Sequence, residues 1–119
     1  MCPLVLAFVD VDGLKATNDS LGHAAGDRLL REIVGRIRAH LRSYDLIVRY
    51  GGDEFACLLT LSTSETARRF EMVRAELAEA GQGSITVGLA ELRPQDSVED
   101  LIARADQALY RQRAERPPA

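Results

Sequence analysis

The sequence has 119 residues, a length that fits one domain over residues 1–119. It carries 15 basic and 18 acidic residues, and this net charge of −3 gives no basic surface of the kind by which nucleic-acid-binding domains hold phosphates. Its two cysteines, Cys2 and Cys57, are too few for a disulfide framework or a cysteine-based zinc site, so we expect a cytoplasmic protein with Cys57 in the core.

The first predicted element is a strand over about residues 4–10. Its residues up to Val9 are continuously apolar, which is typical of a strand buried on both faces. This apolar start has no basic segment and runs into Asp10, so it predicts neither a signal peptide nor a membrane span. A polar turn is expected after the strand. Asp12 in that turn is compatible with two roles, a place in a metal site or stabilisation of the turn through its own backbone.

A helix is predicted next, over about residues 24–42, because apolar residues recur there at helical spacing. Two strands follow, near residues 45–50 and 54–61. The pair Gly51-Gly52 between them predicts a hairpin with a tight turn.

A second helix is predicted from the spacing of Ser62 and Glu65, which matches a capping box. This helix stops at Gly81, since glycine is the usual residue just after a helix. A fourth strand is predicted over about residues 84–91, where apolar residues alternate with small or polar ones.

The last helix starts around Ser97, with Asp100 in capping-box position, and ends before Pro117-Pro118. The predicted order of elements is therefore β-α-β-β-α-β-α. This order favours an α+β fold, a ferredoxin-like sandwich in which helices cover one face of an antiparallel β-sheet. Palm-type nucleotidyl cyclases are built on such a sheet.

Carboxylates mark two of the predicted strands. Asp10 ends the first strand, while Asp53 and Glu54 follow the two glycines of the hairpin. Mg²⁺ prefers oxygen ligands, usually one or two carboxylates with the rest from phosphate and water. A metal held in this way lowers the pKa of an attacking hydroxyl. If the strands are neighbours, the pattern predicts a nucleotidyl-transfer site; the alternative for each acid is a solvated loop residue.

Five sequence blocks occur in one order across most of the chain. They are Phe8-x-Asp10-x-Asp12-x-x-Lys15-x-x-Asn18-Asp19, Gly22-His23-x-x-Gly26-Asp27, Arg42-x-x-Asp45, Arg49-Tyr50-Gly51-Gly52-Asp53-Glu54-Phe55 and Ala105-Asp106-Gln107-Ala108-Leu109-Tyr110. In these blocks the sequence resembles the GGDEF domain, the catalytic domain of the diguanylate cyclase family. One Gly-Gly-Asp-Glu-Phe is a weak signal, whereas five ordered blocks are a strong one.

The resemblance implies a catalytic and metal site. Asp10 and the carbonyl of Val11 are then ligands of Mg²⁺ or Mn²⁺, and Glu54 is a further ligand. Asp53 is expected both to bind the metal and to act as the base for an attacking 3′-hydroxyl. Lys15 resembles the family's cation that stabilises charge on the reacting phosphates, and its alternative is an ordinary surface lysine.

The resemblance also implies a site for GTP. Asn18 and Asp27 resemble the pair that recognises guanine, and the alternative is that both are helix caps. Gly51 and Gly52 would pass close to phosphate or ribose. Arg113 stands where the family has a lysine that binds triphosphate.

Arg42 and Asp45 resemble the family's inhibitory site, where an Arg-x-x-Asp motif binds the product cyclic di-GMP. Taken alone, such a pair at a helix end is usually surface charge. Arg74 is a candidate accessory arginine for the same site. Arg49 is expected either to contact phosphate or to pair with a nearby carboxylate.

The function implied by the resemblance is the condensation of two GTP into cyclic di-GMP and pyrophosphate, in which each 3′-hydroxyl attacks the α-phosphate of the other GTP. A homodimer is then needed, and no nucleic acid or membrane partner is expected. Relative to the family, the N-terminal helix and the C-terminal strand are missing, which favours a second hypothesis, a weak or inactive module that binds GTP or cyclic di-GMP. A third hypothesis, another palm-type cyclase or a polymerase, ranks last because of Asn18 and Asp27.

Overall fold

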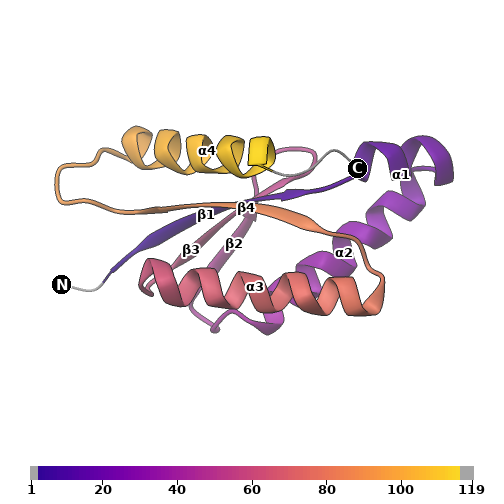
Figure 1. Ribbon diagram of the computed structural model, residues 1–119, viewed down its shortest axis with the longest axis horizontal. Helices are drawn as coiled ribbons and strands as arrows, with labels where there is room; N and C mark the ends of the chain where they lie inside the picture. The colour runs from indigo at the N-terminus through magenta and orange to yellow at the C-terminus, as the bar shows by residue number, and fades with distance from the viewer. Residues whose placement is uncertain (1–2, 116–119) are drawn as a thin grey trace.

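The computed structural model describes residues 3–115, which form four strands and four helices. In chain order these elements are β1 (Val5–Val11), α1 (Leu14–Leu21), α2 (His23–Ala39), β2 (Leu46–Arg49), β3 (Glu54–Leu59), α3 (Thr63–Ala80), β4 (Ile85–Glu91) and α4 (Val98–Glu115). Helices lie on both sides of a twisted sheet (Figure 1). Within the described residues, no helix is both long and apolar enough to cross a membrane.

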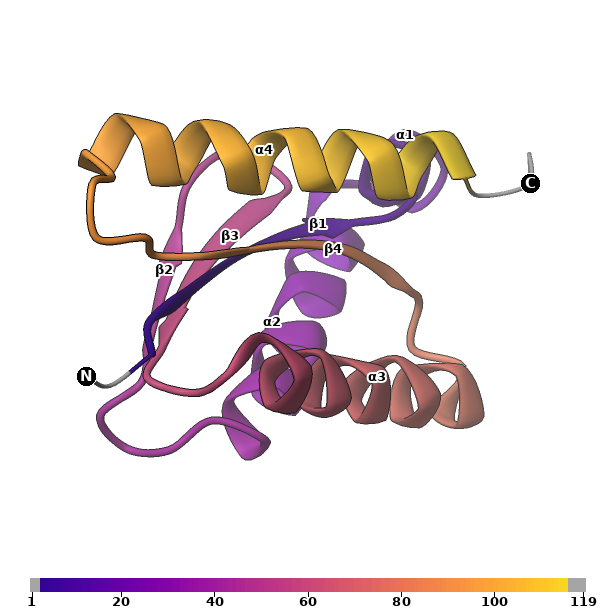
Figure 2. The ribbon, with the colours of Figure 1, turned by 60° about the vertical axis from the view of Figure 1, so that its left-hand side comes forward.

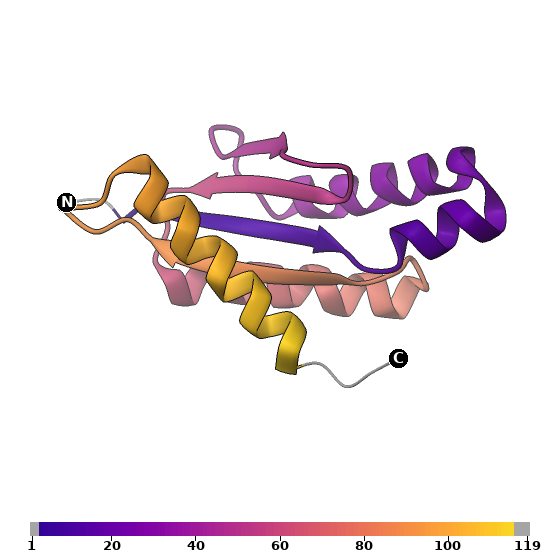
Figure 3. The same cartoon turned by 90° about the horizontal axis from the view of Figure 1, so that it is seen from above.

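The strands form one antiparallel sheet in the order β2-β3-β1-β4, which confirms the predicted α+β fold. β1 lies in the interior of the sheet, between β3 and β4 (Figure 3). All seven of its residues are buried, as its continuous apolar run predicted. The register places Asp10 opposite Glu54 of β3 and opposite Thr86 of β4. The strand pairing therefore brings two of the predicted acidic residues together at the end of β1.

Helices cover both faces of the sheet, so the prediction that they cover one face is wrong. On one face, α2 and α3 contribute Ile33 and Leu77 to a core cluster. On the other face, α4 contributes Leu109 to a second cluster that contains Phe8 of β1 (Figure 2). Successive side chains of a strand point to opposite faces, so a strand that is apolar at every position has to be covered on both.

A short helix, α1, replaces the polar turn that was predicted after β1. It follows Gly13, which has a φ of 72°, and it ends at Gly22, which has a φ of 88°. Leu14 is the one buried residue of α1, so the segment carries no apolar periodicity from which a helix is predicted. The helix predicted over residues 24–42 is α2, which starts directly after Gly22.

The hairpin between β2 and β3 has a loop of residues 50–53 in place of the predicted tight turn. The backbone N–H groups of Tyr50 and Gly51 both donate to the carbonyl of Glu54, at 2.9 and 3.2 Å. Neither Gly51 nor Gly52 has a positive φ, so this loop does not use the backbone freedom that a two-residue glycine turn requires. The side chain of Arg49 holds the loop instead, because its Nε donates to the carbonyl of Gly51 at 3.2 Å and its Nη2 to that of Gly52 at 2.6 Å.

Two of the long helices start at the predicted caps. At the start of α4, Ser97 and Asp100 exchange both hydrogen bonds of a capping box, at 3.0 and 3.1 Å. At the start of α3, Ser62 Oγ accepts from the N–H of Glu65 at 3.1 Å, but the Glu65 carboxylate accepts from Arg68. The capping box predicted at the start of α4 is confirmed, whereas the one predicted at the start of α3 forms only one of its two hydrogen bonds.

A close contact between α4 and β4 fixes the second layer of the fold. A Cβ at Gly88 would lie 2.6 Å from the Ala105 carbonyl oxygen, so glycine lets the helix backbone rest directly on the strand. Cys57 is buried, as predicted, and burial raises the pKa of its thiol to about 12. Cys2 and Pro117-Pro118 lie outside the described residues.

Candidate active site

Three carboxylates converge where β1 ends and β3 begins. Asp10 pairs with Glu54 across the two strands, and the N–H of Val11 donates to the carbonyl of Asp53 at 2.9 Å. One carboxylate oxygen each from Asp10, Asp53 and Glu54 lies within 4.8 Å of the others. We call these three residues the acid cluster. The prediction that the two acidic segments lie next to each other is thus confirmed.

Asp10 is the buried member of the acid cluster. Its residue is 6% exposed, and its Oδ1 has no hydrogen-bond partner among the described residues. The pKa of Asp10 is raised to about 6, mainly by burial and to a smaller extent by the nearby charges of Asp53 and Asp12, against the opposing effect of Arg113. A buried carboxylate oxygen without a partner is costly. The acid cluster therefore fits a hard divalent cation, whose preferred ligands are oxygen atoms.

Arg113 of α4 contacts the acid cluster, a contact that the sequence pattern did not predict. Its Nη2 forms an ion pair with Asp10 Oδ2 and lies 3.9 Å from Glu54 Oε1. Burial lowers the pKa of Arg113, but the hydrogen bond and charge of Asp10 outweigh this and raise it. The guanidinium thus remains a cation beside the carboxylates.

Asp12 fastens the chain after β1 to β4. Its carboxylate accepts hydrogen bonds from Ser84 Oγ and Thr86 Oγ1, both at 2.8 Å, and its N–H donates to the Ser84 carbonyl at 3.0 Å. Of the two roles left open, the structure supports a stabilising one. It acts through a neighbouring strand rather than through its own turn, and no local sequence signal marks this partner.

A pocket of about 390 Å³ lies beside the acid cluster, between α1, α2 and the hairpin loop. Its lining contains most of the residues that were predicted to bind or activate GTP, namely Lys15, Asn18, Asp27, Gly52 and Asp53, together with Arg49. Its size falls in the range of small-molecule sites.

Asn18 and Asp27 face this pocket from two consecutive helices. Asn18 lies inside α1 and Asp27 inside α2, so the alternative that they cap these helices is wrong. A Cβ at Gly26 would lie 2.9 Å from Asn18 Cγ and closer still to its Oδ1. Gly26 therefore allows the Asn18 side chain to lie directly against α2, next to Asp27.

Arg49 lines the same pocket, and its guanidinium is already engaged. Its two hydrogen bonds go to the carbonyls of Gly51 and Gly52. Arg49 was expected either to contact phosphate or to pair with a nearby carboxylate. Among the described residues it pairs with no carboxylate, and the contact with phosphate stays a prediction. Arg49 instead shapes the loop that carries Asp53.

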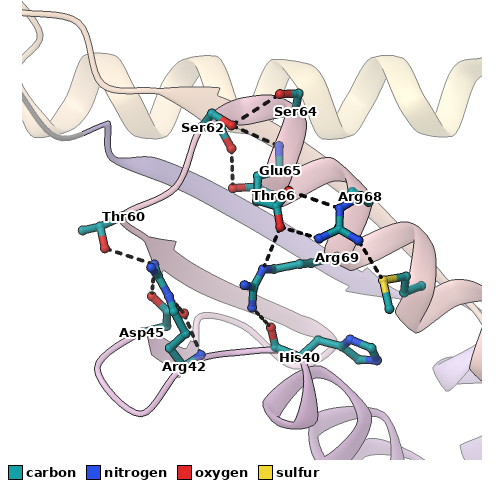
Figure 4. A network of polar contacts seen from close by, with 11 residues as sticks. His40, Arg42, Asp45, Thr60, Ser62, Ser64, Glu65, Thr66, Arg68 and Arg69 are labelled. Atoms are coloured by element: carbon teal, nitrogen blue, oxygen red, sulfur yellow. Dashed lines mark hydrogen bonds and ion pairs between the residues drawn. The ribbon is translucent and has the colours of Figure 1, made fainter.

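Arg42 and Asp45 form a second polar site after α2 (Figure 4), and neither residue lines the pocket. Asp45 Oδ2 accepts from the N–H of Arg42 at 2.7 Å and from its Nε at 3.1 Å, and Asp45 Oδ1 accepts from Nη2 at 3.0 Å. Nη2 also donates to Thr60 Oγ1, and the guanidinium lies 4.6 Å from the ring centre of Tyr44. Burial alone would raise the pKa of Asp45, but the bonds from Arg42 outweigh it and lower the pKa.

The arginine of α3 that lies near this pair is Arg69. Its Nη1 donates to the carbonyl of His40 at 2.6 Å, and its charge helps to lower the pKa of Asp45 (Figure 4). Arg74, the predicted accessory arginine, binds the Ile85 carbonyl and Glu71. No local sequence signal separates these two arginines, because the rotation of α3 about its axis decides which of them faces the end of α2.

The model of the family described as "Diguanylate cyclase, GGDEF domain" matches residues 2–117. The chain belongs to the GGDEF domain family. It is 38% identical over 117 residues to the diguanylate cyclase DgcP of Pseudomonas aeruginosa, which covers 91% of the chain and 17% of DgcP. It is also 38% identical over 118 residues to the diguanylate cyclase DosC of Escherichia coli, which covers 91% of the chain and 26% of DosC. The chain thus spans roughly a sixth to a quarter of the length of these relatives.

Solved GGDEF domains share this fold. The GGDEF domain of DgcB from Caulobacter crescentus, crystallised in complex with c-di-GMP, matches with a TM-score of 0.87 at 30% identity, covering 97% of this chain and 75% of that one. The active GGEEF domain of a diguanylate cyclase from Vibrio cholerae matches with a TM-score of 0.84 at 30% identity, covering 97% and 80%.

Proposed function

We propose that this GGDEF domain condenses two molecules of GTP into cyclic di-GMP and releases pyrophosphate. The observation that carries the proposal is the acid cluster, in which one oxygen of each of three carboxylates lies within 4.8 Å of the others, beside a pocket that Asp53 also lines. The names of the relatives, which are diguanylate cyclases, support the same reaction.

Asp10, Glu54 and the Val11 carbonyl are the residues that we assign to a divalent cation. When bound, Mg²⁺ or Mn²⁺ neutralises phosphate charge and lowers the pKa of the attacking 3′-hydroxyl. Asp53 belongs to both the acid cluster and the pocket lining, so it is placed to bind the cation and to accept the proton of that hydroxyl.

The pocket residues bind and orient GTP in this proposal. The Asp27 carboxylate accepts from guanine N1–H and N2–H, while the Asn18 amide offers a donor and an acceptor. Lys15 projects from α1 into the same lining and stabilises charge on the phosphates. The loop of Gly51 and Gly52 brings backbone, without side chains, close to ribose or phosphate.

Two copies of the domain are needed for the reaction. Each pocket holds one GTP, and the 3′-hydroxyl of each GTP has to meet the α-phosphorus of the other in line, with pyrophosphate as the leaving group. Holding the two substrates face to face provides the proximity that this attack requires. A homodimer, permanent or transient, supplies that arrangement.

We also propose that cyclic di-GMP inhibits the enzyme by binding at Arg42 and Asp45. The Arg42 guanidinium is engaged by Asp45 and Thr60 at its edge and lies over the ring of Tyr44. These contacts fix the guanidinium in one orientation, in which it can donate to a phosphate of the product. Arg42→Ala should relieve inhibition by added cyclic di-GMP and leave the initial rate with GTP unchanged.

The experiment that tests the proposal is incubation with GTP and Mg²⁺, followed by mass spectrometry of the products. Cyclic di-GMP should form, and Asp53→Ala should abolish it. Glu79→Ala is a matched control, because it truncates an exposed acid of α3 outside the acid cluster in the same way. GTP that is bound without turnover at high protein concentration would contradict the proposal and favour a nucleotide-binding regulatory module.

A further inference from the structure

Arg113 lies in the last turn of α4, and its side chain reaches the acid cluster at the end of β1. Its Nη2 pairs with Asp10 Oδ2 and lies 3.9 Å from Glu54 Oε1. The Arg113 side chain is 44% exposed, whereas that of Asp10 is 9% exposed. The guanidinium therefore meets the buried carboxylate from the solvent side, where an incoming ion or nucleotide would also arrive.

The position of α4 does not depend on this ion pair. Leu101, Ala105 and Leu109 are buried in the core, and the α4 backbone rests on Gly88. An ion pair with a partner that is nearly half exposed adds little to the stability of a fold. The contact of Arg113 with the acid cluster is therefore better explained by the charge of that cluster than by the packing of the helix.

The two oxygens of the Asp10 carboxylate differ in their surroundings. Oδ2 pairs with Arg113, whereas Oδ1 is buried and has no hydrogen-bond partner among residues 3–115. A divalent cation bound by this carboxylate would stand within a few ångströms of the guanidinium, where like charges repel strongly in a partly buried site. Arg113 and a metal ion thus compete for the same negative charge.

We propose that Arg113 is a built-in countercation, which holds the acid cluster before substrate arrives and moves to the phosphates when metal and GTP enter. The competition between Arg113 and the metal is inferred from the ion pairs of Arg113 with Asp10 and Glu54 alone. The movement of Arg113 to the phosphates rests on the proposed function. Because the phosphates give the displaced guanidinium a new partner, metal and nucleotide bind cooperatively. Arg113 is thus a positioning residue that keeps the acid cluster from binding metal tightly without nucleotide.

Titration of the 119-residue chain with Mn²⁺ alone, followed by electron paramagnetic resonance, tests the competition. Arg113→Gln should bind Mn²⁺ roughly tenfold more tightly, since one positive charge leaves the site. Arg113→Lys keeps the charge and should restore weak binding. Arg111→Gln removes the same charge from an exposed position on the same helix and should leave the Mn²⁺ affinity unchanged. An unchanged or weaker affinity in Arg113→Gln, or an equal gain in Arg111→Gln, overturns the proposal.

Binding of a non-hydrolysable GTP analogue in the presence of Mn²⁺ tests the transfer to phosphate. Arg113→Gln should bind the analogue roughly tenfold more weakly, because a charge-assisted bond to phosphate is lost. The gain in Mn²⁺ affinity that the analogue causes in the wild type should shrink in this variant. Wild-type affinity for the analogue in Arg113→Gln overturns the transfer. If the wild type itself fails to bind the analogue, the proposed function fails, and the titration with Mn²⁺ alone still decides whether Arg113 competes with metal.

Discussion

Replacing Gly26 with alanine should push Asn18 out of its place in the nucleotide pocket. A Cβ at this position would lie 2.9 Å from Asn18 Cγ and closer still to its Oδ1. Carbon atoms in contact lie about 3.5–4.0 Å apart, so the Asn18 side chain has to retreat by roughly 1 Å. Both residues line the pocket, and Asn18 is one of the two that we assign to guanine.

A displacement of roughly 1 Å in a group that positions a substrate lowers the rate by about 100-fold, which corresponds to about 2.7 kcal/mol. We therefore expect kcat/KM for GTP to fall by roughly 30- to 100-fold in Gly26→Ala. Stability should change less, because alanine in a helix gains about 0.5–1 kcal/mol over glycine and offsets part of the strain.

Steady-state kinetics with GTP and thermal unfolding measure the two effects. Gly35→Ala is the matched control, because it makes the same substitution in the same helix, where the added Cβ has no atom within 4 Å apart from its own helical backbone and chain neighbours. This control should raise the unfolding temperature and leave kcat/KM unchanged. Wild-type kcat/KM in Gly26→Ala would refute the reasoning, since it would mean that the position of Asn18 does not matter for GTP.

Two further predictions concern stability and are measured by urea denaturation. Asp45→Asn should destabilise the chain by about 2–3 kcal/mol at pH 7, because it weakens the hydrogen bonds that a buried carboxylate accepts from Arg42. Burial alone would raise the pKa of Asp45, but the hydrogen bonds from Arg42 outweigh burial and hold this pKa below 3.8. The ionised carboxylate therefore stabilises the fold above about pH 3.8, and this stabilisation is lost as the pH falls through the lowered pKa. The difference between wild type and variant should therefore shrink below about pH 4, and a difference that stays constant would contradict this explanation. Gly88→Ala should lower the free energy of unfolding by about 3 kcal/mol or more. Its Cβ would lie 2.6 Å from the Ala105 carbonyl oxygen and from the Leu109 Cα, so α4 has to move away from β4. Wild-type stability in this variant would show that the contact is not tight.

The strands and the three long helices were predictable because each carries a repeated apolar pattern. The presence of helices on both faces of the sheet was not predicted. The apolar run of β1 contained the reason for it, because a strand that is buried on both faces needs helices on both faces. The short helix α1 was missed because Leu14 is its one buried residue, which leaves no period to detect. The hairpin loop was mistaken for a two-residue turn because the role of Arg49 in holding it depends on side-chain contacts.

The candidate site was predictable where the residues lie in neighbouring segments or in a family motif, as Asp53 and Glu54 do. Its other contacts join distant parts of the chain. Asp12 accepts hydrogen bonds from Ser84 and Thr86, at the start of β4, and Arg113 of the last helix forms an ion pair with Asp10. The partners are far apart in the sequence, so no local spacing predicts either contact. These are tertiary contacts, set by the order of strands in the sheet and by the packing of α4.

Turnover of GTP by the wild type and by Asp53→Asn, compared at saturating nucleotide and Mg²⁺, tests the account most directly. Asp53→Asn keeps the size of the side chain and removes its charge, so GTP binding should change little. The account predicts that the wild type forms cyclic di-GMP and that the variant turns over GTP roughly 100- to 10,000-fold more slowly, the range for loss of a general base. A variant that keeps wild-type turnover, or a wild type that binds GTP and forms no cyclic di-GMP, would contradict the claim that the acid cluster is the catalytic centre.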